Sequence, residues 1–269
     1  MRRALWGLRR LHRTAGAAIL TLGILCQTAI TGGSAARSTR RIDIRGHEQT
    51  LQVYGLPAPN IAIVSSGDGG WVHLAPHVAE VLAAHGWYVV GFDAKAYLSS
   101  FTSSQGPLSE QDVERDYAQL IDLVTSQRRD RPVLIGVSEG AGLAVLAGTN
   151  DIVKRRIQGV LGLGLPDISE LGWRWRDMLI YVTHTTPSEP TFSAAQIVGR
   201  LAPLPLAAIH STHDEFVSVA EINRLMARAS EPKKLWTIEA ADHRFSNNEE
   251  ELDRRLFEAL TWIKQHSPQ

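Results

Sequence analysis

Apolar stretches about the length of a β-strand alternate with stretches of helical periodicity through most of this chain. The strand-length stretches are Ile61–Val64, Tyr88–Phe92, Val133–Ile135, Val160–Leu165, Leu206–Ile209 and Leu235–Ile238. Between them, apolar residues recur at helical spacing, as at Tyr117, Leu120 and Val124, and the final segment Glu249–Gln265 repeats the spacing. Such alternation is typical of βαβ units with parallel strands. We therefore predict an α/β fold with a mostly parallel central sheet and helices on both faces.

Two further segments complete this outline. Ile42–Ile44 and Thr50–Tyr54 precede the alternating part, and we expect them to pair as an antiparallel hairpin at one edge of the sheet. Residues 166–201 interrupt the alternation with aromatic residues and prolines. Long insertions in compact domains are often lids or binding loops, so we expect a cap there; the alternative is a surface excursion that buries its own aromatic side chains.

The first 36 residues differ in composition from the rest. Arginines stand at positions 2, 3, 9, 10 and 13, an uncharged and largely apolar stretch covers 14–36, and small residues occupy 33–36. This order is typical of a secretory signal, with cleavage after Ala35 or Ala36. The alternative is an uncleaved membrane anchor through residues 15–30, since the apolar run is near the lower limit for a span. Both readings predict export to the periplasm and leave 37–269 as one domain.

Charge and cysteine content exclude several functions. The chain has 28 basic and 28 acidic side chains, and no acid precedes Asp43, so removal of the five leading arginines leaves a net charge of −5. Nucleic-acid ligands are disfavoured, because phosphate backbones are bound chiefly by Lys and Arg. The single cysteine, Cys26, lies in the leader, so no disulfide framework exists within the chain. The histidines show no metal-ligand spacing, and we expect neither a metal nor a cofactor.

A G-x-S-x-G motif, Gly136–Gly140, follows the apolar stretch Val133–Ile135 and precedes a segment of small residues, Ala141–Gly148. In a strand–turn–helix context this motif is the nucleophile elbow, a sharp turn that exposes the serine hydroxyl above the sheet. The glycines are needed because neighbouring backbone comes too close for a Cβ. We therefore predict that Ser138 is a nucleophile.

A nucleophilic serine needs a base and an orienting acid, which in this architecture follow later strands in the order Ser, acid, His. Asp214 follows Leu206–Ile209, and His243 follows Leu235–Ile238. We therefore predict Asp214 as the acid and His243 as the base. The competing residues are Glu215 and Asp167 for the acid, and His210 and His213 for the base.

The Gly-rich stretch Ser65–Trp71 lies between an apolar strand and a predicted helix. An oxyanion hole is expected to combine the backbone N–H of Glu139 with an N–H of this loop, from Asp68 or Gly69. Gly-rich loops before helices also bind phosphate, but no nucleotide-binding Gly pattern is present. Contacts with the substrate are expected from Gly67, Gly70 and Trp71 of the loop and from Trp173 of 166–201.

The S-G-D-G-G-W sequence of Ser66–Trp71, the Gly136–Gly140 motif, and the later Asp214 and His243 together resemble the VirJ/AcvB family of exported α/β-hydrolase-like proteins. The resemblance extends over Ile61–Ile263, although residues 91–97 match the family's signature after its second core strand only in part. It implies an α/β-hydrolase fold, hydrolysis of aminoacyl-phosphatidylglycerol, and the same catalytic and oxyanion residues as above.

The expected function is therefore an exported serine hydrolase that cleaves an ester, such as lysyl- or alanyl-phosphatidylglycerol, at the inner-membrane surface through an acyl-enzyme. A second interpretation keeps the triad but changes the substrate, giving a carboxylesterase, thioesterase or peptidase. A third is a non-enzymatic periplasmic accessory protein of secretion or virulence, which uses the fold to bind partner proteins.

Overall fold

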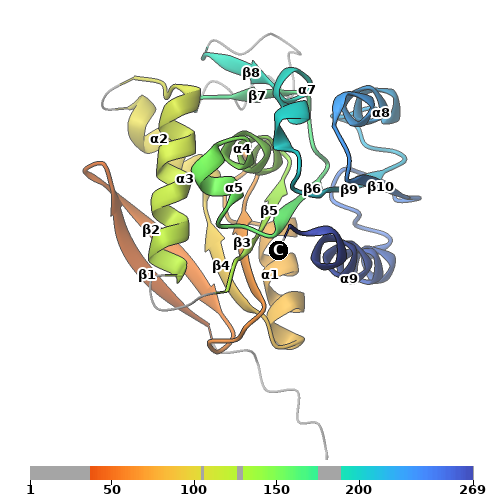
Figure 1. Cartoon of the computed structure of the whole chain (residues 1–269), viewed down its shortest axis with the longest axis horizontal. Coiled ribbons are helices and arrows are strands. Elements are labelled where there is room, and N and C mark those ends of the chain that lie inside the picture. The colour runs from red at the N-terminus through yellow and green to blue at the C-terminus, as the bar shows by residue number, and fades with distance from the viewer. Residues whose placement is uncertain (1–36, 104–105, 126–129, 175–188, 269) are drawn as a thin grey trace, which may run out of the picture. The chain divides into compact units, whose positions relative to one another are not determined.

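The computed structural model describes residues 37–103, 106–125, 130–174 and 189–268, which belong to one compact unit, Ser34–Gln269. Eight strands form its central sheet (Figure 1). In chain order they are β1 (Arg37–Ile44), β2 (His47–Tyr54), β3 (Ile61–Ser65), β4 (Tyr88–Phe92), β5 (Val133–Val137), β6 (Gly159–Leu163), β9 (Leu206–Ser211) and β10 (Lys233–Ile238). Their order in space is β1-β2-β4-β3-β5-β6-β9-β10.

The six strands from β4 to β10 in this spatial order are parallel, and β2 joins them antiparallel to β4. The predicted hairpin is present at one edge but is longer than expected, because β1 and β2 pair from Arg37 to Tyr54 around a turn at Arg45 and Gly46. The opposite edge is β10, whose only strand partner in the described part of the chain is β9.

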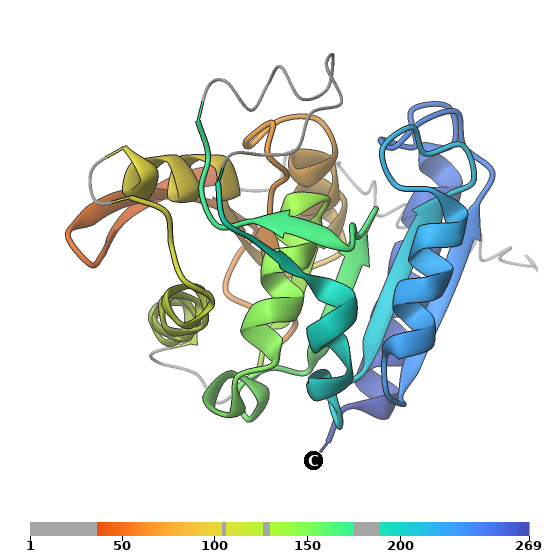
Figure 2. The ribbon, with the colours of Figure 1, turned by 90° about the horizontal axis from the view of Figure 1, so that it is seen from above.

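Helices cover both faces of the sheet (Figure 2). One face packs against α1 (Leu74–Ala84) and α9 (Glu249–His266). The other carries α2 (Ala94–Thr102), α3 (Glu110–Thr125), α4 (Glu139–Gly148), α5 (Asp151–Lys154), α7 (Ala194–Ile197) and α8 (Val219–Arg228). Every residue of β3, β5, β6 and β9 is buried. A parallel sheet covered on both faces requires apolar residues on both sides of each strand, which explains the uninterrupted apolar runs. The predicted fold is confirmed.

Helix α2 is absent from the sequence-based outline. Its N-terminus is capped by Asp93, whose carboxylate accepts the N–H of Ala96 at 3.0 Å. Its inward face consists of Tyr97, Leu98 and Phe101, which are all buried. The segment is short and carries three polar residues in its last turn, so its apolar spacing covers too few residues to indicate a helix.

The described part of 166–201 contains two short antiparallel strands, β7 (Ile168–Glu170) and β8 (Thr191–Ser193), followed by α7 and a 3₁₀ turn, Val198–Leu201. Phe192 is buried and joins the core beside α4. The predicted lid and the alternative of a self-packed excursion depend on residues 175–188, which lie outside the described residues, as does the predicted leader, 1–36. Among the helices described, none is long and apolar enough to cross a membrane.

Candidate active site

Ser138 occupies the turn between β5 and α4 with φ 51° and ψ −120°. A positive φ is unfavourable for a residue with a side chain and is maintained only where the surroundings fix it. The two motif glycines provide that constraint. A Cβ on Gly136 would overlap the carbonyl oxygen of Gly140, and one on Gly140 would overlap the carbonyl oxygen of Ser66. The local geometry is that of the predicted elbow.

The loop after β9 brings Asp214 to the loop after β10, where His243 lies. His243 Nδ1 is 2.6 Å from Asp214 Oδ2. The other carboxylate oxygen accepts the N–H groups of Phe216 at 2.9 Å and Val217 at 2.8 Å. Burial of Asp214 acts to raise its pKa, but the hydrogen bond with His243 and the two amides outweigh it, so the pKa lies below its ordinary value. The carboxylate is therefore ionised at neutral pH and can stabilise a protonated imidazole.

The imidazole of His243 is fixed on several sides. The Phe216 ring packs edge-on against the imidazole, with the ring centroids 5.4 Å apart. The backbone N–H of His243 donates to Glu215 Oε2 at 2.8 Å. Gly164, with φ +59°, passes so close that a Cβ there would overlap the imidazole. His243 is only 7% exposed, and its Nε2 has no hydrogen-bond partner among the described residues. A buried imidazole with one free nitrogen is suited to accept a proton from a reacting group.

Ser138 and His243 both lie next to the end of β6, and no hydrogen bond joins the Ser138 hydroxyl to His243 Nε2 among the described residues. The N–H of Ser138 donates to the carbonyl of Leu163 at 2.8 Å, and the next residue, Gly164, touches the His243 ring. Three loops, after β5, β9 and β10, thus bring Ser138, Asp214 and His243 together at the carboxyl edge of the sheet, where parallel α/β sheets place their ligands.

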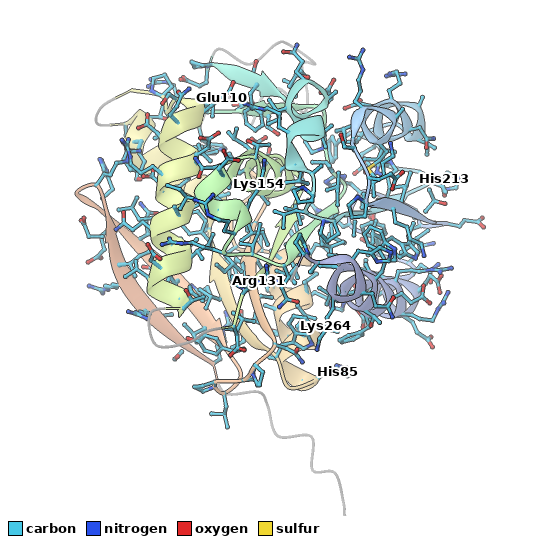
Figure 3. All side chains as sticks on the ribbon, viewed as in Figure 1. His85, Glu110, Arg131, Lys154, His213 and Lys264 are labelled. Carbon is cyan, nitrogen blue, oxygen red and sulfur yellow. The ribbon has the colours of Figure 1, made fainter. Side chains whose placement is uncertain are left out.

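The competing acids and bases have other partners. Asp167 accepts the hydroxyl of Ser193 at 2.7 Å and an α7 amide, which fixes the start of that helix. Glu215 holds the backbone of His243 rather than its ring. His213 is exposed beside β10 (Figure 3), and its Nδ1 lies 3.1 Å from the carbonyl oxygen of Ala240. His210 is fully buried with Nδ1 4.0 Å from Asp214 Oδ2, and burial lowers its pKa.

The Gly-rich loop after β3 forms a tight turn against the nucleophile. The N–H of Gly70 donates to the carbonyl of Gly67 at 3.0 Å, which puts Asp68 and Gly69 at the tip. A Cβ on Gly67 would lie 3.3 Å from Ser138 Cβ, so the loop passes directly beside the serine. This arrangement is compatible with an oxyanion hole that pairs a loop amide with the N–H of Glu139.

Three carboxyl groups gather next to this turn. Glu139 is buried, and its Oε1 accepts the N–H of Glu170 on β7 at 2.8 Å. Burial raises the pKa of Glu139 well above its ordinary value, and the nearby carboxylates of Glu170 and Asp68 raise it further. Burial also raises the pKa of Asp68, although His243 and Lys95 partly offset this. The region beside Ser138 is therefore acidic, and Glu139 retains a proton to a higher pH than an exposed glutamate.

The two tryptophans predicted to contact substrate are placed differently from each other. The indole of Trp71 packs over Gly91 of β4, and its Nε1 donates to Tyr54 Oη at 3.1 Å. The structure thus shows Trp71 packed within the fold, and it does not test the predicted contact with substrate. Trp173 lies under the ammonium of Lys95, 4.4 Å from the ring centroid, and Lys95 in turn contacts Gly70. Trp173 is thereby linked to the Gly-rich loop.

Gly164 and Glu170 are site residues that the sequence-based prediction missed. Gly164 follows a strand as many turn glycines do, and only its neighbour in space, His243, explains why a side chain is excluded. Glu170 reaches Glu139 because β7 crosses above α4, and nothing in the linear spacing indicates this. In the part of the chain that the structure describes, no group of His, Cys, Asp and Glu residues could hold a metal ion.

Comparison with solved structures identifies the fold. An esterase domain of a Rhodothermus marinus protein aligns with a TM-score of 0.58 and 19% identity over 86% of this chain and 98% of its own. An esterase from Pyrococcus furiosus aligns with a TM-score of 0.64 and 17% identity, over 85% of this chain and 90% of its own. A membrane phospholipase A described as a bacterial virulence factor aligns with a TM-score of 0.64 and 12% identity, over 85% of this chain and 87% of its own. At such identities the likeness establishes the α/β-hydrolase fold.

No curated protein matches this chain. The sequence does match the family described as bacterial virulence protein (VirJ), over residues 59–262. This range includes the Gly-rich loop, the elbow at Ser138 and the loops of Asp214 and His243. It covers well over half of the chain, so the protein belongs to the VirJ family.

Proposed function

We propose that this protein is a serine hydrolase that cleaves an ester through a Ser138–His243–Asp214 triad. One observation carries the proposal: Ser138 sits in a strained elbow beside a buried imidazole that is hydrogen-bonded to an ionised Asp214 and has its other nitrogen free. Burial with an unpartnered ring nitrogen is shared by His210, so His243 is distinguished by its 2.6 Å hydrogen bond with the ionised Asp214 and by its place next to the end of β6.

The proposed reaction has two stages. Ser138 Oγ attacks the ester carbonyl carbon and passes its proton to His243 Nε2, while backbone amides of the Gly67–Gly70 turn and of Glu139 bind the oxyanion. The carbon–oxygen bond to the alcohol then breaks, and the leaving alcohol takes the proton from His243. Water, deprotonated by His243, hydrolyses the acyl–Ser138 ester and restores the free hydroxyl. Asp214 stabilises the imidazolium in both stages.

We further propose aminoacyl-phosphatidylglycerol, lysyl or alanyl, as the substrate. Membership in the VirJ family supports a lipid ester of this kind. The position of Asp68 at the tip of the Gly-rich turn beside Ser138 also supports it, because an ionised carboxylate there would attract the ammonium group of an aminoacyl ester. The Arg-rich, apolar leader supports export to the periplasm, which would place the protein at the inner-membrane surface.

Two assays test the proposal. The protein and its Ser138→Ala variant are first treated with a fluorophosphonate probe, and then with lysyl- and alanyl-phosphatidylglycerol, with amino-acid release as the readout. A matched control is Ser99→Ala, whose hydroxyl donates only to the carbonyl of Ala96 in the described structure. We expect labelling and release by the wild type and by Ser99→Ala, and neither by Ser138→Ala.

Other outcomes select the alternatives. Labelling without amino-acid release, together with hydrolysis of simple esters or thioesters, would replace the lipid substrate by that of a general esterase or thioesterase, the names that several similar structures carry. No labelling of a correctly folded wild type would refute the hydrolase and favour the non-enzymatic accessory protein.

A further inference from the structure

His210 is a buried imidazole that the proposed reaction does not use. It belongs to β9, and its side chain is fully buried. Neither Nδ1 nor Nε2 has a hydrogen-bond partner among the described residues. A polar group that is buried without a partner costs free energy, so such a group in a folded protein requires an explanation. The charge that the ring faces provides one.

The ring of His210 faces the carboxylate of Asp214. Nδ1 of His210 lies 4.0 Å from Asp214 Oδ2, the same oxygen that lies 2.6 Å from His243 Nδ1. A distance of 4.0 Å is too long for a hydrogen bond, but a polar N–H still interacts with a full charge, and more strongly where water is excluded. Because the pKa of Asp214 lies below its ordinary value, the carboxylate is ionised and favours the tautomer of His210 with its proton on Nδ1.

The interior position of His210 keeps its ring neutral. Burial lowers the pKa of His210, although Asp214 and the backbone of Val217 act in the opposite direction. The other titratable groups that act on the ring are His243, which lowers this pKa further, and Glu221 of α8, which raises it. A neutral ring can direct an N–H at Asp214 without competing with His243 for the proton of the nucleophile.

His210 is also more firmly supported than Asp214. Every residue of β9 is buried, and the strand pairs with β6 on one side and with β10 on the other. Asp214 lies in the loop beyond the end of β9, where two backbone N–H groups hold its Oδ1. Side chains on strands are held more precisely than side chains on loops. An N–H on β9 is therefore well placed to fix the other oxygen, Oδ2.

We propose that His210 is a positioning residue of the site, whose Nδ1–H faces Asp214 Oδ2 and fixes the carboxylate in the orientation that binds His243. The proposal rests on the function proposed above, because His210 acts through two members of the triad and not in contact with the substrate. Without this N–H, the carboxylate can turn away from His243, and the imidazole is then oriented less well toward Ser138.

Two substitutions separate orientation from packing, because they preserve opposite properties of the imidazole. His210→Asn retains an N–H donor as many bonds from the backbone as Nδ1 is, but it leaves a cavity. His210→Phe retains the volume of the ring and has no donor. Packing alone therefore predicts that the Phe variant is the more active one, whereas positioning predicts that the Asn variant is.

Steady-state kinetics on p-nitrophenyl acetate, a soluble ester, and thermal melts measure the two orders. We expect His210→Phe to lower kcat about tenfold with little change in KM, because the reacting groups are misaligned while binding is kept. His210→Asn should retain most of the wild-type kcat although it melts at a lower temperature than His210→Phe. His213→Phe is the matched control, since His213 is an exposed histidine of the same loop region, and it should leave kcat unchanged.

A proton NMR spectrum gives a readout that does not depend on turnover. The His243 Nδ1–H that is bonded to Asp214 should resonate at low field, because charge-assisted hydrogen bonds are short and strong. Its absence in His243→Gln identifies the signal. We expect His210→Asn to keep this resonance and His210→Phe to move it upfield or broaden it. If His210→Phe does not fold, His210→Leu, which also lacks a donor, takes its place.

Three results would overturn the role of His210. They are equal kcat in His210→Asn and His210→Phe, kcat values that follow the order of thermal stability, and a His243 Nδ1–H resonance that is unchanged in His210→Phe. Failure of the proposed hydrolase would look different. The resonance would then respond to the His210 variants as expected, while the wild type would neither cleave esters nor react with the fluorophosphonate probe.

Discussion

Two buried carboxyl groups show how differently this protein treats acidic side chains. Asp116 on α3 is fully paired: Arg45 Nε and Nη2 each donate to it at 2.7 Å, and the Tyr97 hydroxyl donates at 2.7 Å. Glu139 on α4 accepts one backbone amide and faces two further carboxyl groups. The Asp116 cluster joins the β1–β2 turn to α2 and α3, whereas Glu139 adjoins the proposed nucleophile. Complete pairing is typical of a structural group, whereas buried ionisable groups with raised pKa values gather at functional sites, which agrees with the proposed role of Ser138.

The largest effect is expected at the catalytic side of this comparison. His243→Ala should lower kcat/KM for ester hydrolysis by about 10³- to 10⁴-fold, because the proton acceptor for Ser138 is lost. His213→Ala is the matched control, since His213 is exposed and carries no such role. Steady-state kinetics with thermal melts as a folding check provide the measurement. Comparable losses in both variants would show that the histidines support the loop rather than the reaction.

The largest effect on stability is expected at Asp116. Asp116→Ala should lower the free energy of unfolding by about 3 kcal/mol, because removal of one partner leaves the Arg45 guanidinium and the Tyr97 hydroxyl without their acceptor. Activity per folded molecule should not change. The control is Asp112→Ala, whose pair with Arg45 at 3.3 Å is more exposed and should contribute less than about 1 kcal/mol. The measurement is the free energy of unfolding of both variants in urea. Equal losses of stability in the two variants would contradict the expected difference between the buried and the exposed ion pair.

At Gly164, a substitution should affect both activity and stability. Gly164→Ala introduces a Cβ where the His243 ring lies, at a backbone φ of +59°. Displacement of the imidazole should lower kcat by about 10²-fold, with KM much less affected. Gly46→Ala, also at positive φ but with open space around the new Cβ, should cost stability without loss of kcat. Unchanged kcat in Gly164→Ala would show that the ring is not held where the reaction requires it.

The smallest effect is a pH dependence at Glu139. Because its pKa is raised in the folded state, the protonated form contributes stability that is present below the unfolded pKa and is lost as pH rises through the folded pKa. Glu139→Gln cannot ionise and avoids that loss. The Tm difference between variant and wild type should therefore increase with pH. A difference that does not change with pH would mean that folding does not raise the pKa of Glu139.

The sheet could be predicted because its buried strands require continuous apolar residues. The elbow could be predicted from its five-residue motif, in which Gly136 is required by contact with Gly140, although Gly140 is itself required by the distant carbonyl oxygen of Ser66. The loop positions of Asp214 and His243 followed from strand order, and the structure places the two in hydrogen-bond contact; their catalytic roles remain predictions. Strand order depends on local patterns, so these features are accessible without coordinates.

The remaining features depend on contacts between distant residues. The ion pair of Arg45 and Asp116 joins residues 71 positions apart. Trp71 belongs to the distinctive S-G-D-G-G-W sequence, yet its indole packs on Gly91, a position whose missing side chain has no meaning until the two are seen together. Such pairs produce no periodicity and no motif spacing, so the sequence alone does not indicate them.

Because β10 lies at the edge of the sheet, the protein should lose its activity before its central strands unfold. His243 is carried by the loop after β10, which pairs with β9 alone, whereas Ser138 follows β5, which is paired on both sides. Edge elements open at lower free energy than central ones. Under gentle heating or dilute urea, ester hydrolysis should therefore be lost while the central strands are still intact, because the proposed base, His243, moves away from the proposed nucleophile, Ser138, which stays in place.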